Sequence, residues 1–545
     1  MTVIGDIARR VMPSARTHGI ARDGRVDAGQ DAGQDAGQDA GERLAFADFR
    51  HTHPAYDGTA LLDDLRRTEY ARLDACGLTY LDYTGGGLYA ESQVRQHHAL
   101  LTSSVFGNPH SESVPSRRMT DRVAAARTRV LDFFSASPDE YEVIFTPNAT
   151  GALRLVGESY PFGPGDRYLL TFDNHNSVNG IREFAWAKHA TVTYIGIRPT
   201  DLRVPHDALE WDFADPGFGD AHAGGVVGRL ADGLRTAGPG GHNLFAYPAQ
   251  SNFSGVQHPL GWIPEAQEAG WDVLLDAAAF VPTNRLDLSR VHPDYVSLSF
   301  YKMFGYPTGV GALLARRPAL EKLHRPWYAG GNIVFSSVRA ASGEGNGYYR
   351  APGPAGFEDG TLNYLGILGV DIGLQHISSI GIDTIHTRVM CLTDWLLQAL
   401  GRLRHRNGAP AVRVYGPADT QARGATVAMN FLDPGGQLID STIVEQLANE
   451  AGIALRSGCH CNPGTREVSI GMTEAEMVEA FRDKDRLSFE EFVRVIDGKT
   501  TGAARASLGV ASTFADVYRF WQFANTLVDR PLPELYDASG CRTGG

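Results

Sequence analysis

The sequence is poor in cysteine, in surplus positive charge and in long apolar runs. Its 545 residues include five cysteines, an odd number and too few for a disulfide framework, which favours a reducing compartment. The net charge of -13 argues against nucleic acid as a partner, because phosphate binding needs a clustered basic surface. No apolar run reaches the ~18 residues of a membrane span, and the N-terminus lacks the apolar core of a secretory signal. We therefore expect a cytoplasmic protein with no membrane partner.

The remaining composition is that of a globular protein, with 43% hydrophobic and 21% charged residues. Residues 27–42 repeat the tetrapeptide DAGQ, with Glu in place of the last Gln. Such a segment has too little apolar surface to offset the entropy that is lost on ordering. Residues 1–45 are therefore predicted to be a disordered tail.

The stretch between Tyr141 and Ala315 alternates short apolar runs with helix-like segments. The runs that are typical of buried strands are EVIF, RYLLTF, TVTYIGI, NLFAYP, WDVLLD, YVSLS and VGALLA. Alternation of strands and helices over this length predicts an α/β fold with a large, mostly parallel sheet that is covered on both faces.

The pattern changes after about residue 380, where a long amphipathic helix precedes the apolar runs VRVYG and TVAMNFL and then a further helix. This pattern predicts a smaller α/β domain with an antiparallel sheet. The predicted organisation is thus a large domain at 116–380 and a small C-terminal domain at 381–545, to which an N-terminal segment at 46–115 contributes.

Polar residues directly follow several of the predicted strands, at the edge where such sheets bind ligands. Asp276 ends one apolar run, where a carboxylate is unfavourable unless it meets a cation, although it also suits the N-cap of a helix. Lys302 follows the next run among aromatic residues and glycines. A lysine in a desolvated pocket has a lowered pKa and forms Schiff bases, whereas a solvated loop charge is the simpler interpretation.

Two earlier strand ends add a possible anion site and a ring. Asn148, Ala149 and Thr150 lie between a strand and a helix, where backbone N–H groups and a hydroxyl suit a phosphate, although Thr150 is equally suited to cap the helix. His175 follows another strand, where a histidine is more often structural. A phosphate cradle, a ring to stack, a carboxylate and a lysine are together what pyridoxal phosphate requires.

The order of these motifs resembles a known family. The segments concerned are NATGALRLV, DNHNSV, AQSNFSG, LDAAAF, SFYKMFGYPTGVGALL, FEDGTLN, RSGCHCNPG and GAARASLG. Over roughly residues 75–530 they resemble class V aminotransferase-fold enzymes, most of all cysteine desulfurases and the desulfurase-like N-terminal part of molybdenum cofactor sulfurases. The resemblance implies fold-type I (aspartate-aminotransferase-like), pyridoxal 5'-phosphate as cofactor, and a homodimer with composite active sites.

The resemblance also implies roles for residues around the cofactor ring. Lys302 matches the Schiff-base lysine, Asp276 the partner of the pyridine nitrogen, and His175 the histidine that stacks on the ring. Asn252 matches a residue near the phenolic oxygen of the cofactor. Arg505 matches the arginine that binds the α-carboxylate of the substrate, a task suited to a bidentate guanidinium.

A second set of matching residues belongs to the phosphate end of the cofactor. Thr150 and Ser299 match phosphate ligands, and Asn148 and Ala149 lie in the same segment as Thr150. Thr361 lies in a segment that the family places near the dimer interface and the active site, so the resemblance includes it among the cofactor-binding residues.

Two cysteines flank His460 in the segment RSGCHCNPG. A zinc site would need four ligands from a second cluster, which the sequence lacks, so no metal is expected, and a redox CxC pair is similarly disfavoured. By resemblance Cys461 is the nucleophile that takes up sulfur as a persulfide, with Arg456 and His460 nearby to favour its thiolate. A buried thiol in a turn is the alternative.

The sequence therefore predicts a cysteine desulfurase or sulfurtransferase that converts L-cysteine to L-alanine, with Lys302, His175 and Cys461 as catalytic residues. A protein or small molecule would then accept the sulfur. Ala279 and Tyr301 replace residues that are common in desulfurases, and Arg466 replaces a cysteine of the sulfurases. These departures keep a C–S lyase or an aminotransferase-type tailoring enzyme of specialised metabolism open, and beside them a non-catalytic scaffold for a sulfur-carrier partner.

Overall fold

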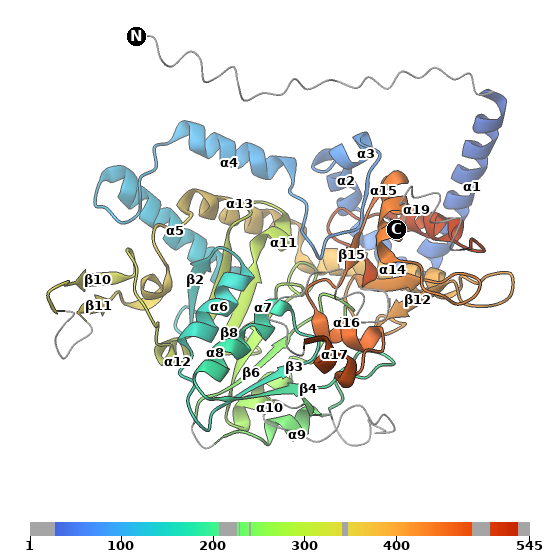
Figure 1. The fold of residues 1–545 in the computed structure, drawn as a ribbon. Helices are drawn as coiled ribbons and strands as arrows, with labels where there is room; N and C mark the ends of the chain where they lie inside the picture. Colours follow the sequence, from blue (N-terminus) through green and yellow to red (C-terminus); the bar gives the residue numbers. More distant parts are fainter. Residues whose placement is uncertain are drawn as a thin grey trace, which may run out of the picture. The chain divides into compact units, whose positions relative to one another are not determined.

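The computed structural model describes residues 28–206, 226–227, 229–238, 241–340, 347–481 and 502–531, and divides into two compact units, Met1–Phe49 and Arg50–Gly545. Helix α1 (Ala28–Thr52) begins in the first unit and contains the DAGQ repeats (Figure 1). This differs from the disordered tail that the sequence predicts. Each repeat supplies an alanine, the strongest helix former, which opposes the weakening effect of its glycine. Residues 1–27 of the predicted tail lie outside the described residues.

The second unit contains a large sheet with the strand order β2-β9-β8-β7-β6-β3-β4-β5. Strand β9 is antiparallel to both its neighbours, and the other pairs are parallel, which agrees with the mostly parallel sheet predicted from the sequence. The strands are β2 (Tyr141–Thr146), β3 (Arg167–Thr171), β4 (Thr191–Ile195), β5 (Val226–Val227), β6 (Asn243–Pro248), β7 (Trp271–Asp276), β8 (Tyr295–Ser299) and β9 (Gly311–Arg316).

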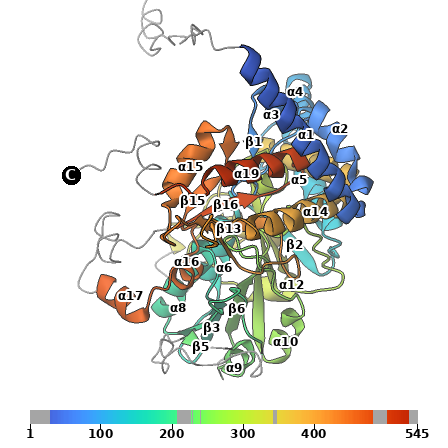
Figure 2. The ribbon, with the colours of Figure 1, turned by 90° about the vertical axis from the view of Figure 1, so that its right-hand side faces the viewer.

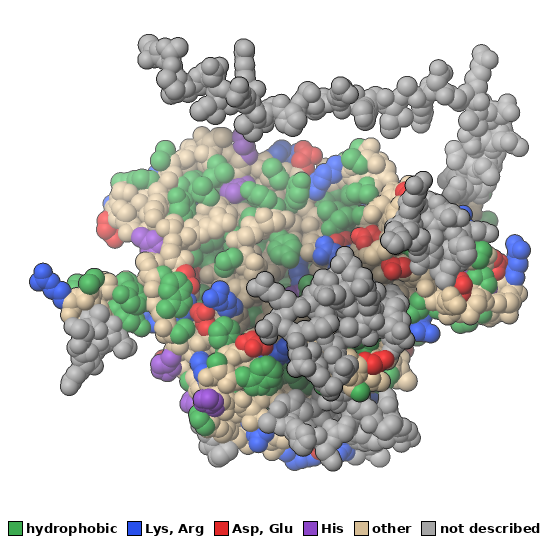
Figure 3. All heavy atoms as spheres, in the orientation of Figure 1, with side chains coloured by type: hydrophobic (Ala, Val, Ile, Leu, Met, Phe, Trp, Pro, Cys, Tyr) green, Lys and Arg blue, Asp and Glu red, His purple; other side chains and the backbone are tan. Residues whose placement is uncertain are grey.

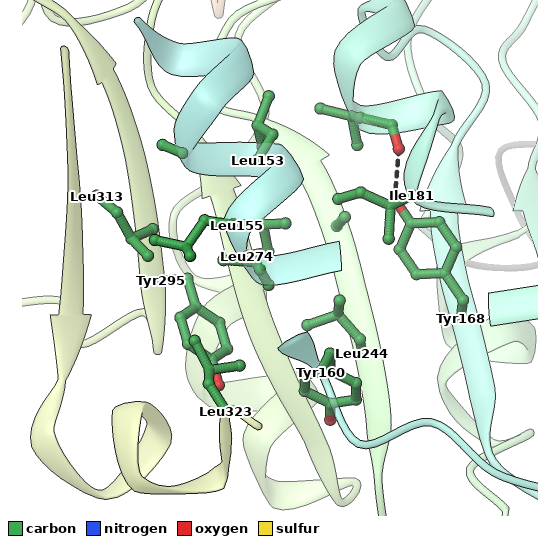
Figure 4. Packing of buried hydrophobic residues seen from close by; sticks show 14 of the residues in the cluster. Leu153, Leu155, Tyr160, Tyr168, Ile181, Leu244, Leu274, Tyr295, Leu313 and Leu323 are labelled. Atoms are coloured by element: carbon green, nitrogen blue, oxygen red, sulfur yellow. Dashed lines mark hydrogen bonds between the residues drawn. The ribbon is translucent and has the colours of Figure 1, made fainter. Parts of the chain in front are cut away.

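One face of this sheet is covered by α6 (Ala149–Ser159) and α8 (Ile181–Ala187), with a core of buried side chains between helices and strands (Figure 4). Leu153 and Leu155 of α6 belong to the same core as Leu244 and Leu274 of the sheet. Replacing such a leucine by alanine typically costs about 2–5 kcal/mol of stability. This packing fixes the N-terminus of α6 at the carboxyl ends of the parallel strands.

Further helices pack on one another and on the large sheet. Helix α13 (Tyr364–Ile380) packs against α5 (Val114–Phe133) and α4 (Glu91–Ser103), and α10 (Trp262–Glu268) packs against β7. Within the described residues no single helix has the length and apolarity to cross a membrane. Helices α13 and α14 (Ile382–Gly401), bent by 68° to one another, meet these two limits only when taken together.

The C-terminal region forms a small antiparallel sheet with the order β12-β13-β16-β15, as the sequence predicts (Figure 2). Its strands are β12 (Val412–Tyr415), β13 (Thr426–Phe431), β15 (Arg456–Gly458) and β16 (Ala503–Ser507). Strand β1 (Thr79–Tyr80) pairs with β14 (Ile453–Ala454), so part of the predicted N-terminal segment joins this region. The domain boundaries at residues 45, 115 and 380 stay a prediction.

Candidate active site

A cavity of about 150 Å³ lies at the carboxyl ends of β6, β7 and β8. It brings together the residues that the sequence predicts for the ring, the phosphate and the lysine, and adds several that it does not. The lining residues are Asn148, Ala149, Thr150, Leu153, His175, Ser177, Pro248, Gln250, Asn252, Asp276, Ala278, Ala279, Ser299, Tyr301 and Lys302.

The N-terminus of α6 forms one end of this cavity. The Asn148 side-chain oxygen caps the helix by accepting a hydrogen bond from the Gly151 amide at 2.9 Å, so Asn148 and not Thr150 is the N-cap. The Ser299 hydroxyl accepts a hydrogen bond from the Ala149 amide at 3.0 Å, and the Thr150 and Ser177 hydroxyls lie 2.8 Å apart. A helix N-terminus surrounded by hydroxyl groups is suited to a phosphate.

Asp276 ends β7 as a buried carboxylate with one oxygen in use. Its Oδ1 accepts hydrogen bonds from the Ser297 hydroxyl at 2.8 Å and from the Ala278 amide at 3.1 Å. Its Oδ2 has no hydrogen-bond partner among the described residues. Asp276 lines the cavity, and a carboxylate oxygen without a partner there suits a protonated pyridine nitrogen.

His175 stands at the start of the short helix α7 (Asn176–Asn179). Its Nδ1 accepts a hydrogen bond from the Ser177 amide at 3.1 Å, which assigns the ring proton to Nε2. Burial lowers the pKa of His175, the Lys302 and Arg505 charges lower it further, and the carboxylate of Asp276 opposes them. The imidazole is therefore neutral near pH 7.

Lys302 lies on α11 (Phe300–Phe304), directly after β8. Burial lowers the pKa of its ammonium group; the Asp276 carboxylate opposes this shift. Its Nζ has no hydrogen-bond partner in the part of the chain that the structure describes. A lysine amine with these properties is a competent nucleophile. Gly87 lets the N-terminal segment cross α11 closely, since an added Cβ would lie 2.7 Å from the Lys302 carbonyl oxygen.

The two cysteines lie in a turn that follows β15. The Asn462 amide donates to the Cys459 carbonyl at 3.0 Å, and His460 and Cys461 have φ values of 51° and 55°, in the left-handed region. Cys461 is exposed and forms no disulfide with a described residue, which does not agree with a buried structural thiol, whereas Cys459 is half-buried. A charge on Cys461 raises the pKa of Lys302, so the thiol lies within electrostatic reach of the cavity.

The groups predicted to favour the Cys461 thiolate have other partners. Burial holds the pKa of His460 well below its usual range, and the charge of Arg505 adds to this, so the imidazole carries no charge near pH 7. Arg456 forms an ion pair with Asp82 at 2.8 Å. Near pH 7 the imidazole of His460 therefore contributes no charge to a Cys461 thiolate, and the sequence did not reveal that this ring is buried.

Arg505 is buried on β16 and already holds a carboxylate of this chain. Its Nη2 donates to Asp82 Oδ1 at 3.0 Å and its Nη1 to the Asn252 carbonyl at 2.9 Å. Its Nε is buried without a partner among the described residues. Burial lowers the pKa of the guanidinium, and Asp82 opposes this effect. Asp82 was missed by the sequence reasoning; its only signal was a carboxylate after two apolar residues.

Thr361 is not in the cavity that contains Lys302. The residue is exposed, accepts a hydrogen bond from the Asn108 side chain at 3.3 Å, and lines a separate cavity of about 280 Å³. Within one chain the structure does not bring Thr361 to the cofactor-binding residues, and its predicted role through a second chain stays a prediction. Ser177, Gln250 and Ser297 were missed, because only the fold brings Ser177 and Gln250 to the cavity and Ser297 to Asp276.

The set of groups in the Lys302 cavity fits pyridoxal phosphate. The unpartnered Asp276 oxygen suits the pyridine nitrogen, the neutral His175 ring suits stacking, and the N-terminus of α6 suits the phosphate. The unpartnered Lys302 amine suits the aldehyde. No other feature of the described residues offers this combination.

Comparison with known proteins agrees with this geometry. The family model for aminotransferase class-V matches residues 79–215 and 239–520. The chain is 35% identical to molybdenum cofactor sulfurase of Bos taurus over 490 residues, which cover 86% of this chain and 52% of that protein. For molybdenum cofactor sulfurase of Arabidopsis thaliana the identity is 35% over 493 residues, covering 86% and 58%. The chain spans about half the length of the curated relatives it matches.

A solved structure shows the same fold. The apo structure of a cysteine desulfurase from Thermococcus onnurineus NA1 matches with a TM-score of 0.66 at 22% identity, over 86% of this chain and 98% of that chain. The predicted α/β fold, that of fold-type I pyridoxal phosphate enzymes, is confirmed by this likeness.

Proposed function

The chain belongs to the aminotransferase class-V family, and we propose that it is a pyridoxal phosphate enzyme that removes sulfur from L-cysteine, releases L-alanine and holds the sulfur as a persulfide on Cys461. One observation carries this proposal. The cavity that holds Lys302, Asp276 and His175 is joined by hydrogen bonds to the turn that exposes Cys461. One such bond runs from the Asn176 amide, next to His175, to the Cys461 carbonyl at 2.7 Å.

Each residue of the cavity has a task in this proposal. When bound, pyridoxal phosphate supplies an aldehyde that condenses with amines and a ring that withdraws electrons. Asp276 Oδ2 would accept a hydrogen bond from the protonated pyridine nitrogen and so keep it charged, and the N-terminus of α6 would hold the phosphate. Lys302 Nζ, with its lowered pKa, takes the proton from the substrate Cα.

Sulfur transfer then takes place at the cysteine turn. The Cys461 thiolate attacks the substrate sulfur, and the Cβ–S bond breaks as the S–S bond forms. Cβ takes up a proton from solvent, and Lys302 returns a proton to Cα, which gives alanine. The exposed position of Cys461 leaves the persulfide open to an acceptor, which we propose to be a protein or a small molecule.

Product analysis with L-cysteine tests this function. The proposal expects alanine in amounts equal to the sulfur recovered as persulfide and sulfide. A C–S lyase is the second candidate, because Ala279 and Tyr301, which depart from the desulfurase pattern, both line the cavity. Pyruvate in place of alanine would establish the lyase and overturn the desulfurase.

We also propose that the enzyme is a cytoplasmic homodimer. Large apolar side chains are exposed on α4, α5 and the hairpin of β10 (Ile333–Ser336) and β11 (Tyr348–Arg350), and Figure 3 shows green side chains over this face. Examples are Leu101, Val114, Phe335 and Tyr349. Extended exposed apolar surface is typical of an interface. Sedimentation should give twice the chain mass, and a fully active monomer would contradict the dimer.

A further inference from the structure

The turn that carries Cys461 is held by a side chain from the cavity wall. Asn252 lines the cavity, and its Nδ2 donates to the His460 carbonyl at 2.7 Å. Its Oδ1 accepts a hydrogen bond from the Asn462 side chain at 3.1 Å. Both ends of the Asn252 amide are thus bonded to residues that flank Cys461.

Asn462 connects the same turn to the end of β3 and to the next helix. Its side chain donates to the Asp173 carbonyl at 2.6 Å and caps α16 (Pro463–Ser469) by accepting from the Thr465 amide at 3.2 Å. Asn462 is completely buried. Close packing supports these bonds, since a Cβ on Gly464 would lie 2.1 Å from the Phe172 carbonyl oxygen.

The backbone of the turn needs such support. Two consecutive residues with side chains, His460 and Cys461, have left-handed φ values, a conformation that L-residues disfavour. The His460 ring donates from Nε2 to the Ala503 carbonyl at 3.0 Å and packs edge-on against Phe253. A strained conformation persists only where surrounding contacts determine it, which points to the hydrogen bonds of Asn252 and Asn462.

We infer that Asn252 and Asn462 are positioning residues that fix Cys461 beside the cavity. Through Asn252, a ligand that binds in the cavity also stabilises the turn. Asn252 Nδ2 carries a second hydrogen that has no partner among the described residues, so a ligand in the cavity can bind the same amide that holds His460. Because these hydrogen bonds fix the turn, the sulfur acceptor must bind next to Cys461 and cannot rely on a movement of the turn. The inference rests on the proposed function only in assigning the sulfur to Cys461.

Hydrogen exchange and alkylation of the substrate-free protein test this inference. Amide exchange of peptides spanning residues 457–466, and iodoacetamide labelling of Cys461 resolved by mass spectrometry, are compared with and without pyridoxal phosphate. In Asn252→Ala both rates should rise on the order of tenfold, as expected for the loss of two hydrogen bonds. In the wild type, loading with pyridoxal phosphate should slow both rates, and Asn252→Ala should remove this response.

Two further variants make the test decisive. Asn462→Ser keeps an oxygen to cap α16 but loses both donated bonds, so it should loosen the turn even if Asn252→Ala fails to fold. Asn243→Ala is the matched control, because Asn243 is a buried asparagine at the opposite end of β6 with two hydrogen bonds to Gly238. It should leave the turn unchanged.

The outcomes separate this inference from the proposed function. Unchanged exchange and labelling of the turn in both Asn252→Ala and Asn462→Ser would overturn the inference, and loss of cofactor binding alone would make Asn252 only a cofactor ligand. With L-cysteine, Asn252→Ala and Asn462→Ser should lower kcat with little change in KM. A looser turn in variants of a protein that forms no alanine would retain the inference and reject the desulfurase.

Discussion

The Lys302 cavity and the cysteine turn are connected by hydrogen bonds but differ in how their own polar groups are paired. Among the described residues, the Lys302 amine and Asp276 Oδ2 in the cavity have no hydrogen-bond partner. In the turn, the carbonyls of Cys459, His460 and Cys461 all accept hydrogen bonds. Unpaired polar groups that line a cavity are available to a ligand, whereas paired backbone groups fix a conformation. The comparison indicates that one region is built to receive a molecule and the other to hold a thiol in place.

Replacing Lys302 should have the largest effect, because it removes the cavity's reactive group. Lys302→Ala should lose the visible absorbance of bound pyridoxal phosphate, and turnover should fall by at least ~10³-fold. Absorbance spectra and alanine release measure the two effects. Compared without pyridoxal phosphate, the turn of Lys302→Ala should have the same hydrogen exchange as that of the wild type, and a looser turn in this comparison would mean that the two regions are not separable.

Replacing the Cys461 thiol should abolish the function of the turn and leave cofactor binding in the Lys302 cavity intact. Cys461→Ser should bind pyridoxal phosphate normally, because the thiol is not part of the cavity wall, but should transfer no sulfur, because serine cannot hold a persulfide. Cys459→Ser is the matched control, and its effect should be small. Wild-type release of sulfide by Cys461→Ser would reject the persulfide mechanism in favour of direct elimination.

Arg505 connects the two regions, so its replacement sharpens the comparison. Arg505→Ala should weaken L-cysteine binding by about 1.5–3 kcal/mol, the range for hydrogen bonds to charged groups. This corresponds to a rise in KM of roughly 10- to 150-fold. Arg505→Lys retains the positive charge but not the bidentate geometry of the guanidinium, so its KM should lie between those of the wild type and Arg505→Ala. An unchanged KM with a lower Tm would show that Arg505 serves Asp82 and Asn252 only.

The smallest effect should come from the pH dependence of the turn. The folded-state pKa of His460 lies well below the unfolded value, so the unfolded chain binds the proton more readily. Stability is then fully present above pH ~6.5 and is lost as the pH falls below it, at up to about 1.4 kcal/mol per pH unit. His460→Gln keeps a donor for the Ala503 carbonyl but does not titrate. Its Tm should fall less than that of the wild type between pH 7 and pH 5.

The sequence was sufficient to predict that Asp276 and Lys302 share a cavity, because the topology of a parallel sheet determines where its strands end. Parallel strands bring their carboxyl ends to one edge, so Asp276 and Lys302, each placed after an apolar run, had to lie near one another. Ser177 and Asp82 could not be found in this way, since their partners come from segments distant in the chain. The charge state of His460 was beyond prediction for the same reason: Ala503 and Phe253, from other parts of the chain, bury its ring.

The pairing of β15 with β16 has a mechanical consequence. Arg456 and Arg505 stand directly opposite one another across these strands, and like charges in that position repel. Asp82 forms ion pairs with both guanidinium groups, and its negative charge offsets their repulsion. Without its carboxylate, the repulsion would push apart the two strands. Strand β15 leads directly into the cysteine turn. Asp82, which is distant from this turn in the sequence, therefore stabilises the strand that positions the Cys461 thiol.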